Sequence, residues 1–298
     1  MRHITVLRTE AVEGLALASD SVVLDCTFGS GGHAEAIIEK LNEKGTYIGL
    51  DADPAAIMAG KERFLETNPT IHLVNENFSQ LETVLSELEI RAPHAILADL
   101  GWRIEQFEAG ERGFSFTAEE PLHMTYGDPQ HYSFTAQSIV NEWAEGDIAN
   151  VLYGYGEEQF SRRIAKRIVD TRDQHGEIST ARELADVIRG AVPAWYRNRP
   201  VHPATKSFQA LRIAVNDEFA VLEELLAKGY QRLTPQGRMA IITFHSLEDR
   251  IVKHTFKSFV SERNASLITK KPITATAEEI KQNPRARSAK LRIIQKHD

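Results

Sequence analysis

The sequence predicts an α/β protein with a doubly wound, Rossmann-like sheet that is interrupted by an inserted helical domain. Short apolar runs alternate with helical segments over the first hundred residues, the alternation stops near residue 106, and it resumes near residue 206. Such an alternation favours a parallel sheet with right-handed crossovers. We therefore expect residues 1–105 and 206–298 to form the α/β domain and residues 106–205 to form the insertion.

The first hundred residues contain four apolar runs that we expect to be strands, at residues 22–24, 47–50, 71–74 and 95–98. Three helices are expected between them, at residues 34–41, from residue 54 onwards, and at residues 80–88. The second of these has a clear start, because Asp53 suits an N-cap and Pro54 suits the first helical position.

The middle of the chain is expected to be a long ordered loop over residues 101–132, followed by helices. One helix is predicted over residues 148–169, and a second begins with Thr180 and Glu183 in a capping-box spacing and stops before Pro193. An apolar stripe at spacings of three and four then predicts one long amphipathic helix over residues 205–232.

The last part of the chain returns to alternating elements. We expect a fifth strand over residues 237–244, a helix over 247–260, a loop-like stretch over 261–284 and a final edge strand over 289–295. Within that stretch, Thr276 and Glu279 are spaced to cap a short helix.

Composition narrows the class of protein. The chain has 298 residues, 42% of them hydrophobic, and it lacks any apolar run of the roughly 18 residues needed to span a bilayer. Its charged N-terminal region is unlike a signal peptide. The single cysteine, Cys26, excludes an internal disulfide and a cysteine-based zinc cluster. We expect a cytoplasmic protein with no membrane association and no metal site.

Charge is distributed unevenly along the chain. Of the 35 Lys and Arg residues, 26 follow residue 160, whereas only 15 of the 42 Asp and Glu residues do. The second half could therefore bind a polyanion despite the net charge of −7. A solvated helix surface rich in Lys and Arg would give the same pattern, so charge alone leaves both interpretations open.

A glycine-rich turn follows the first predicted strand, and an acid follows the second. Residues 25–33 read Asp-Cys-Thr-Phe-Gly-Ser-Gly-Gly-His, and Asp51 lies 20 residues beyond Gly31. Glycines let a ligand approach the backbone closely, and an acid in that place can accept hydrogen bonds from a ribose diol. These features predict a cofactor that contains adenosine.

The glycine pattern favours S-adenosylmethionine over a dinucleotide. A dinucleotide turn would carry a third glycine where the helix starts, and this chain has His33-Ala34 after Gly32. The acid Asp25, ahead of the glycines, suits the ammonium group of S-adenosylmethionine. Phe78, at the end of the third strand, could flank the adenine, although it could equally be a core residue.

Two further polar residues are expected at the same rim of the sheet. Asp99 ends the fourth strand and His245 follows the fifth, and ligands of open α/β sheets bind at the carboxyl ends of strands. Asp99 is therefore placed toward the reacting centre. His245 could act there or serve as a structural hydrogen-bonding residue.

Several motifs resemble those of the bacterial 16S rRNA cytosine-N4 methyltransferases, the MraW/RsmH family. They cover nearly the whole chain in the family's order and are found at residues 27–33, 112–116, 202–205, 208–216, 244–253 and 283–292. The resemblance implies a class I methyltransferase domain with an inserted, mostly helical substrate-recognition domain. It also implies S-adenosylmethionine contacts from Gly31, Gly32, His33, Asp51, Phe78, Asp99 and Gln106.

The implied reaction is methylation of the N4 amine of a cytidine in the decoding region of 16S rRNA, in the small ribosomal subunit or its precursor. Asp99 is the expected proton acceptor, with His123 or His245 assisting. Trp102 or Phe114 could stack on the unstacked base. The expected substrate contacts are Trp102, Arg112, Lys206, Arg212 and Asn216, and the phosphate contacts would come from Arg162, Arg163, Lys166, Arg167, Arg197, Arg199, Lys206 and Arg212. A homodimer is a further expectation.

Two segments depart from the family pattern, at residues 102–105 and 123–126. Both fall in the long loop beside the expected target base. An alternative hypothesis therefore keeps the fold and the cofactor but assigns another methyl acceptor, or a non-catalytic role in RNA binding. A nicotinamide dehydrogenase is disfavoured by the missing third glycine.

Overall fold

The structure is a computed structural model that describes residues 4–101, 112–116 and 119–298. The chain divides into two compact units. Met1–Gly101 and Phe219–Asp298 form the first, which we call the sheet unit, and Trp102–Glu218 form the second, which we call the helical unit. The second boundary therefore falls thirteen residues later than the expected one, after Glu218 instead of after residue 205.

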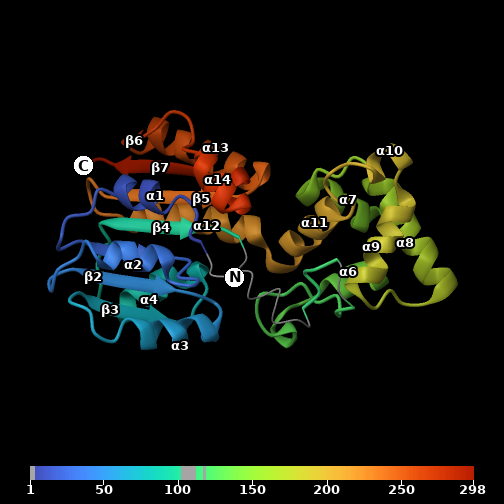
Figure 1. Cartoon of the computed structure of the whole chain (residues 1–298), viewed down its shortest axis with the longest axis horizontal. Coiled ribbons are helices and arrows are strands. Elements are labelled where there is room, and N and C mark those ends of the chain that lie inside the picture. Colours follow the sequence, from blue (N-terminus) through green and yellow to red (C-terminus); the bar gives the residue numbers. More distant parts are fainter. Residues whose placement is uncertain (1–3, 102–111, 117–118) are drawn as a thin grey trace. The chain divides into compact units, whose positions relative to one another are not determined.

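The described part of the sheet unit contains a seven-stranded sheet in the order β3-β2-β1-β4-β5-β7-β6 (Figure 1). The first five strands expected from the sequence are all present and parallel, and the sixth, β7, is antiparallel to both β5 and β6. The strands are β1 (Val22–Asp25), β2 (Thr46–Leu50), β3 (Thr70–Val74), β4 (Ala95–Asp99), β5 (Arg238–Thr243), β6 (Ala265–Leu267) and β7 (Lys290–Lys296). The order reverses direction between β1 and β4, which confirms the doubly wound α/β prediction.

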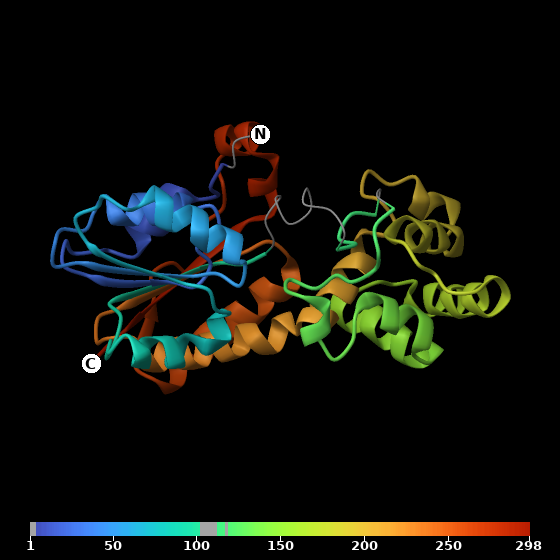
Figure 2. The ribbon, with the colours of Figure 1, turned by 90° about the horizontal axis from the view of Figure 1, so that it is seen from below.

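Helices cover both faces of this sheet (Figure 2). Alternate strand residues point to opposite faces, so Val23 packs with α1 (Arg8–Gly14), α2 (Gly32–Ile38) and α3 (Pro54–Arg63). Leu24 packs on the other face, where the covering helices are α4 (Leu81–Glu87), α12 (Glu218–Arg232) and α13 (Ser246–Glu262). A short α14 (Ala277–Gln282) and two 3₁₀ helices, η1 (Phe78–Gln80) and η3 (Pro284–Ser288), complete the described elements of this unit.

The helical unit has its own apolar core of buried side chains, including Ile139, Leu152, Ile164 and Leu184. Its described helices are η2 (Pro129–His131), α6 (Ala136–Glu142), α7 (Glu145–Gly156), α8 (Ser161–His175), α9 (Ala181–Ala191), α10 (Ala194–Arg197) and α11 (Thr205–Asn216). The predicted cap at Thr180 is confirmed, since its hydroxyl accepts a hydrogen bond from Glu183 N.

Two expected helices are each divided in the structure. The helix predicted over residues 148–169 is two helices, α7 and α8, because Glu157 adopts a left-handed conformation with φ of 47°. The helix predicted over residues 205–232 breaks at Asp217, whose φ is 48°. The apolar spacing continues across this break, but Phe208 packs in the core of the helical unit and Leu222 in that of the sheet unit.

The C-terminal strand also differs from expectation. β7 lies inside the sheet, between β5 and β6, instead of at its edge. The edge strand β6 has only three residues, too few for an alternating pattern to show in the sequence.

Candidate functional site

The glycine-rich turn joins β1 to α2 with two glycines in the left-handed region. Gly29 has φ of 58°, and Gly31, which caps α2, has φ of 77°. Residues other than glycine rarely adopt this backbone conformation, so the conformation of the turn explains why glycines stand at these positions. Gly29 N also donates a 2.8 Å hydrogen bond to Asp51 Oδ2 at the end of β2.

Asp51 is thus tied to the turn that it was predicted to accompany. Its other oxygen, Oδ1, accepts a hydrogen bond from Asp53 N at 2.8 Å, and Asn75 donates to its backbone carbonyl. An ionised carboxylate offers about four acceptor sites, and a ribose diol would use two of them. The position at the rim and the fixed carboxylate fit an adenosine-containing cofactor.

Asp25 lies beneath the turn and is fully buried. Its oxygens accept hydrogen bonds from Thr27 N at 3.0 Å and from the Tyr47 hydroxyl at 2.7 Å. Burial raises the pKa of this carboxyl to about 6, against the hydrogen bonds that lower it. Asp25 therefore has a structural role, which is to hold the turn from inside. This role competes with the expected contact between Asp25 and the ammonium group of the cofactor.

Asp99 ends β4 next to this turn, since its backbone N donates a 2.6 Å hydrogen bond to Thr27 Oγ1. Its side chain is 21% exposed, and Oδ2 lies 3.8 Å from His33 Nδ1. Among the described residues, no donor lies within hydrogen-bond distance of Asp99 Oδ1. Burial raises the pKa of Asp99 well above its usual range, and the negative charges of Asp25 and Glu248 raise it further.

Oδ1 of Asp99, unpartnered among the described residues, shows whether this rim fits the predicted cofactor. A buried carboxylate oxygen without a partner is costly unless a ligand supplies a donor or a positive charge. S-adenosylmethionine carries both an ammonium and a sulfonium, and the amine that would accept its methyl group has N–H donors. The acceptor oxygens of the rim therefore fit this cofactor.

Gly32 and His33 occupy the first turn of α2. Glycine is required at position 32 because of close packing, and not because of a positive φ angle. A Cβ built there would lie 1.7 Å from Thr5 Oγ1, so the N-terminal segment packs directly on this glycine. Arg8 Nε donates to the Gly32 carbonyl at 2.9 Å. His33 is 5% exposed and lies on the buried side of α2.

The tail motif of the sequence holds this N-terminal segment. Asn283, 7% exposed, donates to the Ile4 carbonyl at 2.9 Å, and Glu279 Oε1 accepts a hydrogen bond from Leu7 N at 2.7 Å. Residues 279 and 283 thus support the start of α2 through the segment 4–8. No sequence pattern predicts this link, because the two segments lie about 275 residues apart in the chain.

Phe78 begins η1, directly after Asn77, whose side chain accepts a hydrogen bond from Ser79 N. Its ring is partly buried against the apolar cluster of β1, β2 and α4. Both interpretations of Phe78 therefore stay open, since one side of the ring packs on the core and the residue is not fully covered.

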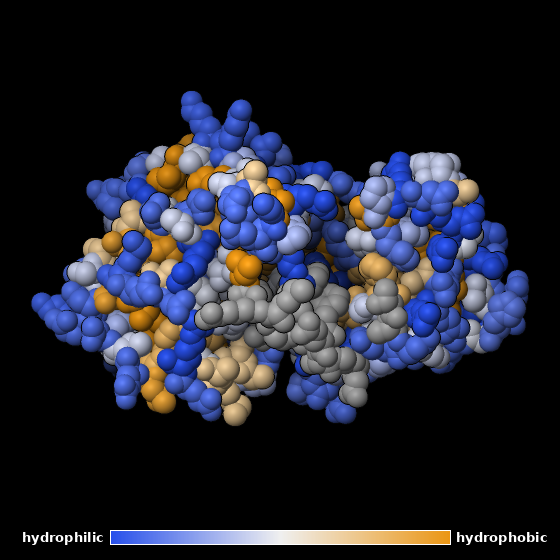
Figure 3. All heavy atoms as spheres, viewed as in Figure 1, coloured by the Kyte–Doolittle hydropathy of each residue, from blue (hydrophilic) through white to orange (hydrophobic). Residues whose placement is uncertain are grey.

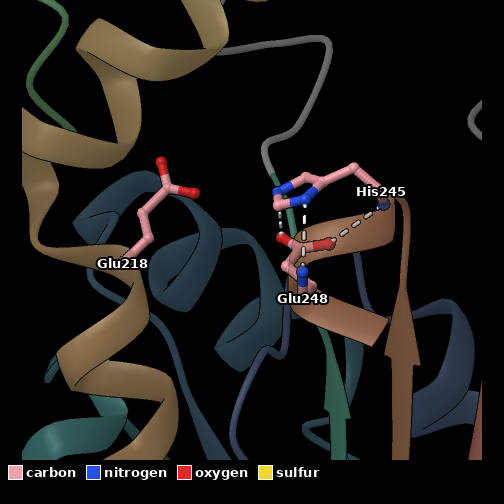
Figure 4. A group of neighbouring side chains, drawn as sticks. All are labelled: Glu218, His245 and Glu248. Atoms are coloured by element: carbon pink, nitrogen blue, oxygen red, sulfur yellow. Dashed lines mark hydrogen bonds and ion pairs between the residues drawn. The ribbon is translucent and has the colours of Figure 1, made fainter. Parts of the chain in front are cut away.

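His245 caps helix α13, as Figure 4 shows. Its Nδ1 accepts a 3.3 Å hydrogen bond from Glu248 N, and its Nε2 lies 3.1 Å from Glu248 Oε1. Glu248 Oε2 in turn accepts hydrogen bonds from Phe244 N and His245 N. Nδ1 of His245 thus caps the helix, whereas Nε2 has no hydrogen-bond partner among the described residues. The structural role of His245 is therefore shown, and its catalytic role stays a prediction.

Three residues expected to contact substrate have internal partners in the helical unit. Arg212 is 8% exposed and makes a bidentate ion pair with Glu218, at 2.7 and 2.9 Å. Asn216 accepts from Tyr126 N and donates to the carbonyls of Met124 and Arg212. The structure therefore gives both residues a role in fixing the loop, and their contact with the substrate stays a prediction.

Arg112 belongs to the same framework, since its guanidinium donates to the Tyr126 carbonyl at 2.6 Å. Phe114 is 6% exposed and stacks on Tyr126, so its ring is unavailable to a base. The divergent segment 123–126 thus makes contacts inside the helical unit, and Thr125 within it is fully buried.

The remaining predicted residues differ in exposure. Lys206 is exposed and donates a hydrogen bond to the Glu157 carbonyl at the end of α7. His123 is partly buried, and its backbone N–H and carbonyl both make hydrogen bonds within the loop region. Trp102 and Gln106 lie outside the described residues.

The basic side chains of α8 are exposed on the surface of the helical unit, whose visible face is mainly hydrophilic (Figure 3). Ile164 and Ile168 point into the core, and the cations point out. The exposed cations on α8 and in the segment after α9 are Arg162, Arg163, Lys166, Arg167, Arg197 and Arg199. In the described parts of the chain, no helix is long and apolar enough to cross a membrane.

Comparisons with known proteins identify the family of this chain. Residues 1–297 match the model of the MraW methylase family. A protein of Heliobacterium mobile named ribosomal RNA small subunit methyltransferase H is 44% identical, over 99% of this chain and 98% of that protein. The protein of the same name from Brevibacillus brevis is 40% identical, over the same shares.

A solved rRNA methylase from Streptococcus thermophilus covers 99% of both chains at 11% identity, with a TM-score of 0.45. The fold assignment rests on the strand order and not on this alignment. The family match over the whole chain confirms the resemblance drawn from the motifs. The chain therefore belongs to the MraW methylase family.

Proposed function

We propose that this protein transfers a methyl group from S-adenosylmethionine to the N4 amine of a cytidine in small-subunit rRNA. The observation that carries the substrate is the similarity to proteins named ribosomal RNA small subunit methyltransferase H, which extends over 99% of this chain. We place the reaction in the cytoplasm. Action on a precursor particle and a homodimer are further predictions, which gradient fractionation of particles and light scattering would test.

Several residues of the sheet unit would hold the cofactor. Asp51 would accept the ribose hydroxyls, the backbone of Gly31, Gly32 and His33 would border its amino-acid end, and Phe78 would flank the adenine. Gln106 stays a prediction outside the described residues. When bound, S-adenosylmethionine supplies a methyl group on a positively charged sulfur.

Asp99 has the chemistry that the methyl acceptor requires. The exocyclic amine of cytosine is a poor nucleophile, because its lone pair is delocalised into the ring, so it must be oriented and relieved of a proton. A carboxylate with a raised pKa is a better proton acceptor than an ordinary aspartate. In this proposal, Asp99 Oδ1 accepts a hydrogen bond from N4 and takes up the proton that the amine loses as its bond to the methyl carbon forms.

A methyl-transfer assay on small ribosomal subunits tests the proposal. The rRNA is digested and its nucleosides are identified by mass spectrometry, with N4-methylcytidine as the expected product. Asp99→Asn should lower kcat by roughly 10²–10⁴-fold, the usual contribution of a general base. Asp147→Asn, an exposed carboxylate on α7, serves as the matched control.

Two results would contradict the proposal. A product methylated at another nucleotide or atom would support the alternative acceptor, which the divergent segment 102–105 makes worth testing. Full activity of a folded Asp99→Asn variant would remove Asp99 as the proton acceptor.

A further inference from the structure

An exposed aromatic residue stands out on the helical unit. Trp195, in the short helix α10, is 55% exposed, although tryptophan is usually well covered in folded proteins. It belongs to a group of aromatic and arginine side chains that we call the Trp195 cluster, composed of Phe160, Arg163, Trp195, Tyr196 and Arg199.

The members of the cluster contact one another in an interleaved arrangement. The rings of Trp195 and Tyr196 both pack edge-on against Phe160, at centroid distances of 5.8 and 5.0 Å. The Arg199 guanidinium lies 4.8 Å from the Trp195 ring centre and 5.0 Å from that of Tyr196. Arg163 lies 5.9 Å from the ring centre of Phe160.

A buried carboxylate fixes the base of this cluster. Glu158 is fully buried, and its Oε2 accepts a 2.7 Å hydrogen bond from the Tyr196 hydroxyl. Its Oε1 accepts a 2.9 Å hydrogen bond from Phe160 N. The indole of Trp195 therefore rests on a rigid support, so binding a ligand to it would cost little ordering of the protein.

The surroundings of the cluster are positively charged. Arg162, Lys166 and Arg167 on α8 and Arg197 on α10 are also exposed, and they are close in the sequence to the cluster's own Arg163 and Arg199. An exposed indole beside arginines offers a face for stacking and cations for phosphates, which are the two features of single-stranded nucleic-acid sites.

We propose that the Trp195 cluster binds an unpaired stretch of RNA, with one base stacked on Trp195 and the neighbouring phosphates contacted by Arg163 and Arg199. The inference rests on the proposed function, in that the bound RNA is the methyl acceptor. It adds a second contact for that RNA, carried by the helical unit alone.

Fluorescence anisotropy with a labelled short oligouridylate and with a duplex RNA of equal length tests the proposal. Trp195→Ala should weaken oligouridylate binding by roughly 5- to 100-fold, which corresponds to the loss of one stacked base. Trp195→Phe should keep most of the affinity, and duplex binding should not change. Tyr153→Ala, which removes another exposed aromatic ring of the helical unit, should leave both affinities at the wild-type value.

A second variant tests the cations. Arg199→Gln should reduce the slope of log affinity against log salt by about 0.7, the value for one phosphate contact on a single strand. An unchanged slope would remove Arg199 from the site.

The outcomes separate this inference from the proposed function. A wild-type protein that methylates rRNA, together with a Trp195→Ala variant of unchanged oligouridylate affinity, would overturn the inference alone. The same holds if the variant loses methyl transfer on ribosomal particles but not RNA affinity, since the cluster would then contact a protein of the particle. A wild-type protein that binds RNA through Trp195 but transfers no methyl group would overturn the proposed function instead.

Discussion

Ionisation of Asp25 should make the folded protein less stable at neutral pH than at pH 4. A neutral residue at this position should remove that loss of stability. The pKa of Asp25 is about 6 in the folded state, against a usual value of 3.8. The folded state therefore binds more protons than the unfolded state between roughly pH 4 and pH 6, so stability falls as pH rises through this window. The difference between these two pKa values corresponds to about 3 kcal/mol of stability.

Asp25→Asn keeps the size of the side chain and an acceptor for Thr27 N, and the Tyr47 hydroxyl can rotate to accept from the new amide. The variant cannot ionise. We expect its free energy of unfolding to match wild type near pH 4 and to exceed it by about 3 kcal/mol at pH 8. Denaturant unfolding followed by fluorescence across this range measures the difference.

The same variant should also affect the site. The charge of Asp25 contributes to the raised pKa of Asp99, so its removal should lower the pKa of Asp99. The rise of methyl transfer with pH should then move to lower pH. Parallel stability curves for the two proteins, or a variant less stable than wild type at pH 8, would refute the assigned charge and burial of Asp25.

Three further predictions concern cofactor binding, the stability of the loop and RNA binding. Asp51→Ala should weaken S-adenosylmethionine binding by about 1–3 kcal/mol in calorimetric titration, and unchanged affinity in a folded variant would remove Asp51 as the ribose acceptor. Asn216→Ala should lower the free energy of unfolding by about 1–3 kcal/mol, because it leaves Tyr126 N and the Met124 carbonyl without their partner, and a melting temperature equal to wild type would contradict this. Replacing Arg162, Arg163 and Arg167 on α8 by glutamine, all three together, should reduce the salt dependence of RNA binding without changing cofactor affinity. An unaltered slope of log affinity against log salt would place the RNA on another surface.

The strands and the turn of the sheet unit could be predicted because their signals are local. Each of the first four strands is a short apolar run, and the cap of α3 at Asp53 is confirmed by its 2.9 Å hydrogen bond from Ala55 N. The association of the glycine turn with Asp51 was also predictable, since a strand–turn–helix followed by an acid has one physical arrangement in this fold.

The roles of single polar residues could not be predicted in this way. Arg212 and Asn216 lie in a motif that the sequence identified, but only the fold shows that Glu218 and the 124–126 segment are their partners. His245 is similar, because a cap and a base look alike until the direction of Glu248 is known.

The sequence by itself determined the order of the elements, the α/β class and the family, because apolar periodicity and motif spacing are properties of neighbouring residues. The tertiary structure decided where the predicted long helix breaks. The apolar stripe is continuous in the sequence, but Phe208 and Leu222 pack in two separate cores. It also decided the raised pKa of Asp99, because that pKa depends on burial and on the charges of Asp25 in β1 and Glu248 in α13. Contacts between distant segments set these properties, and no local pattern encodes them.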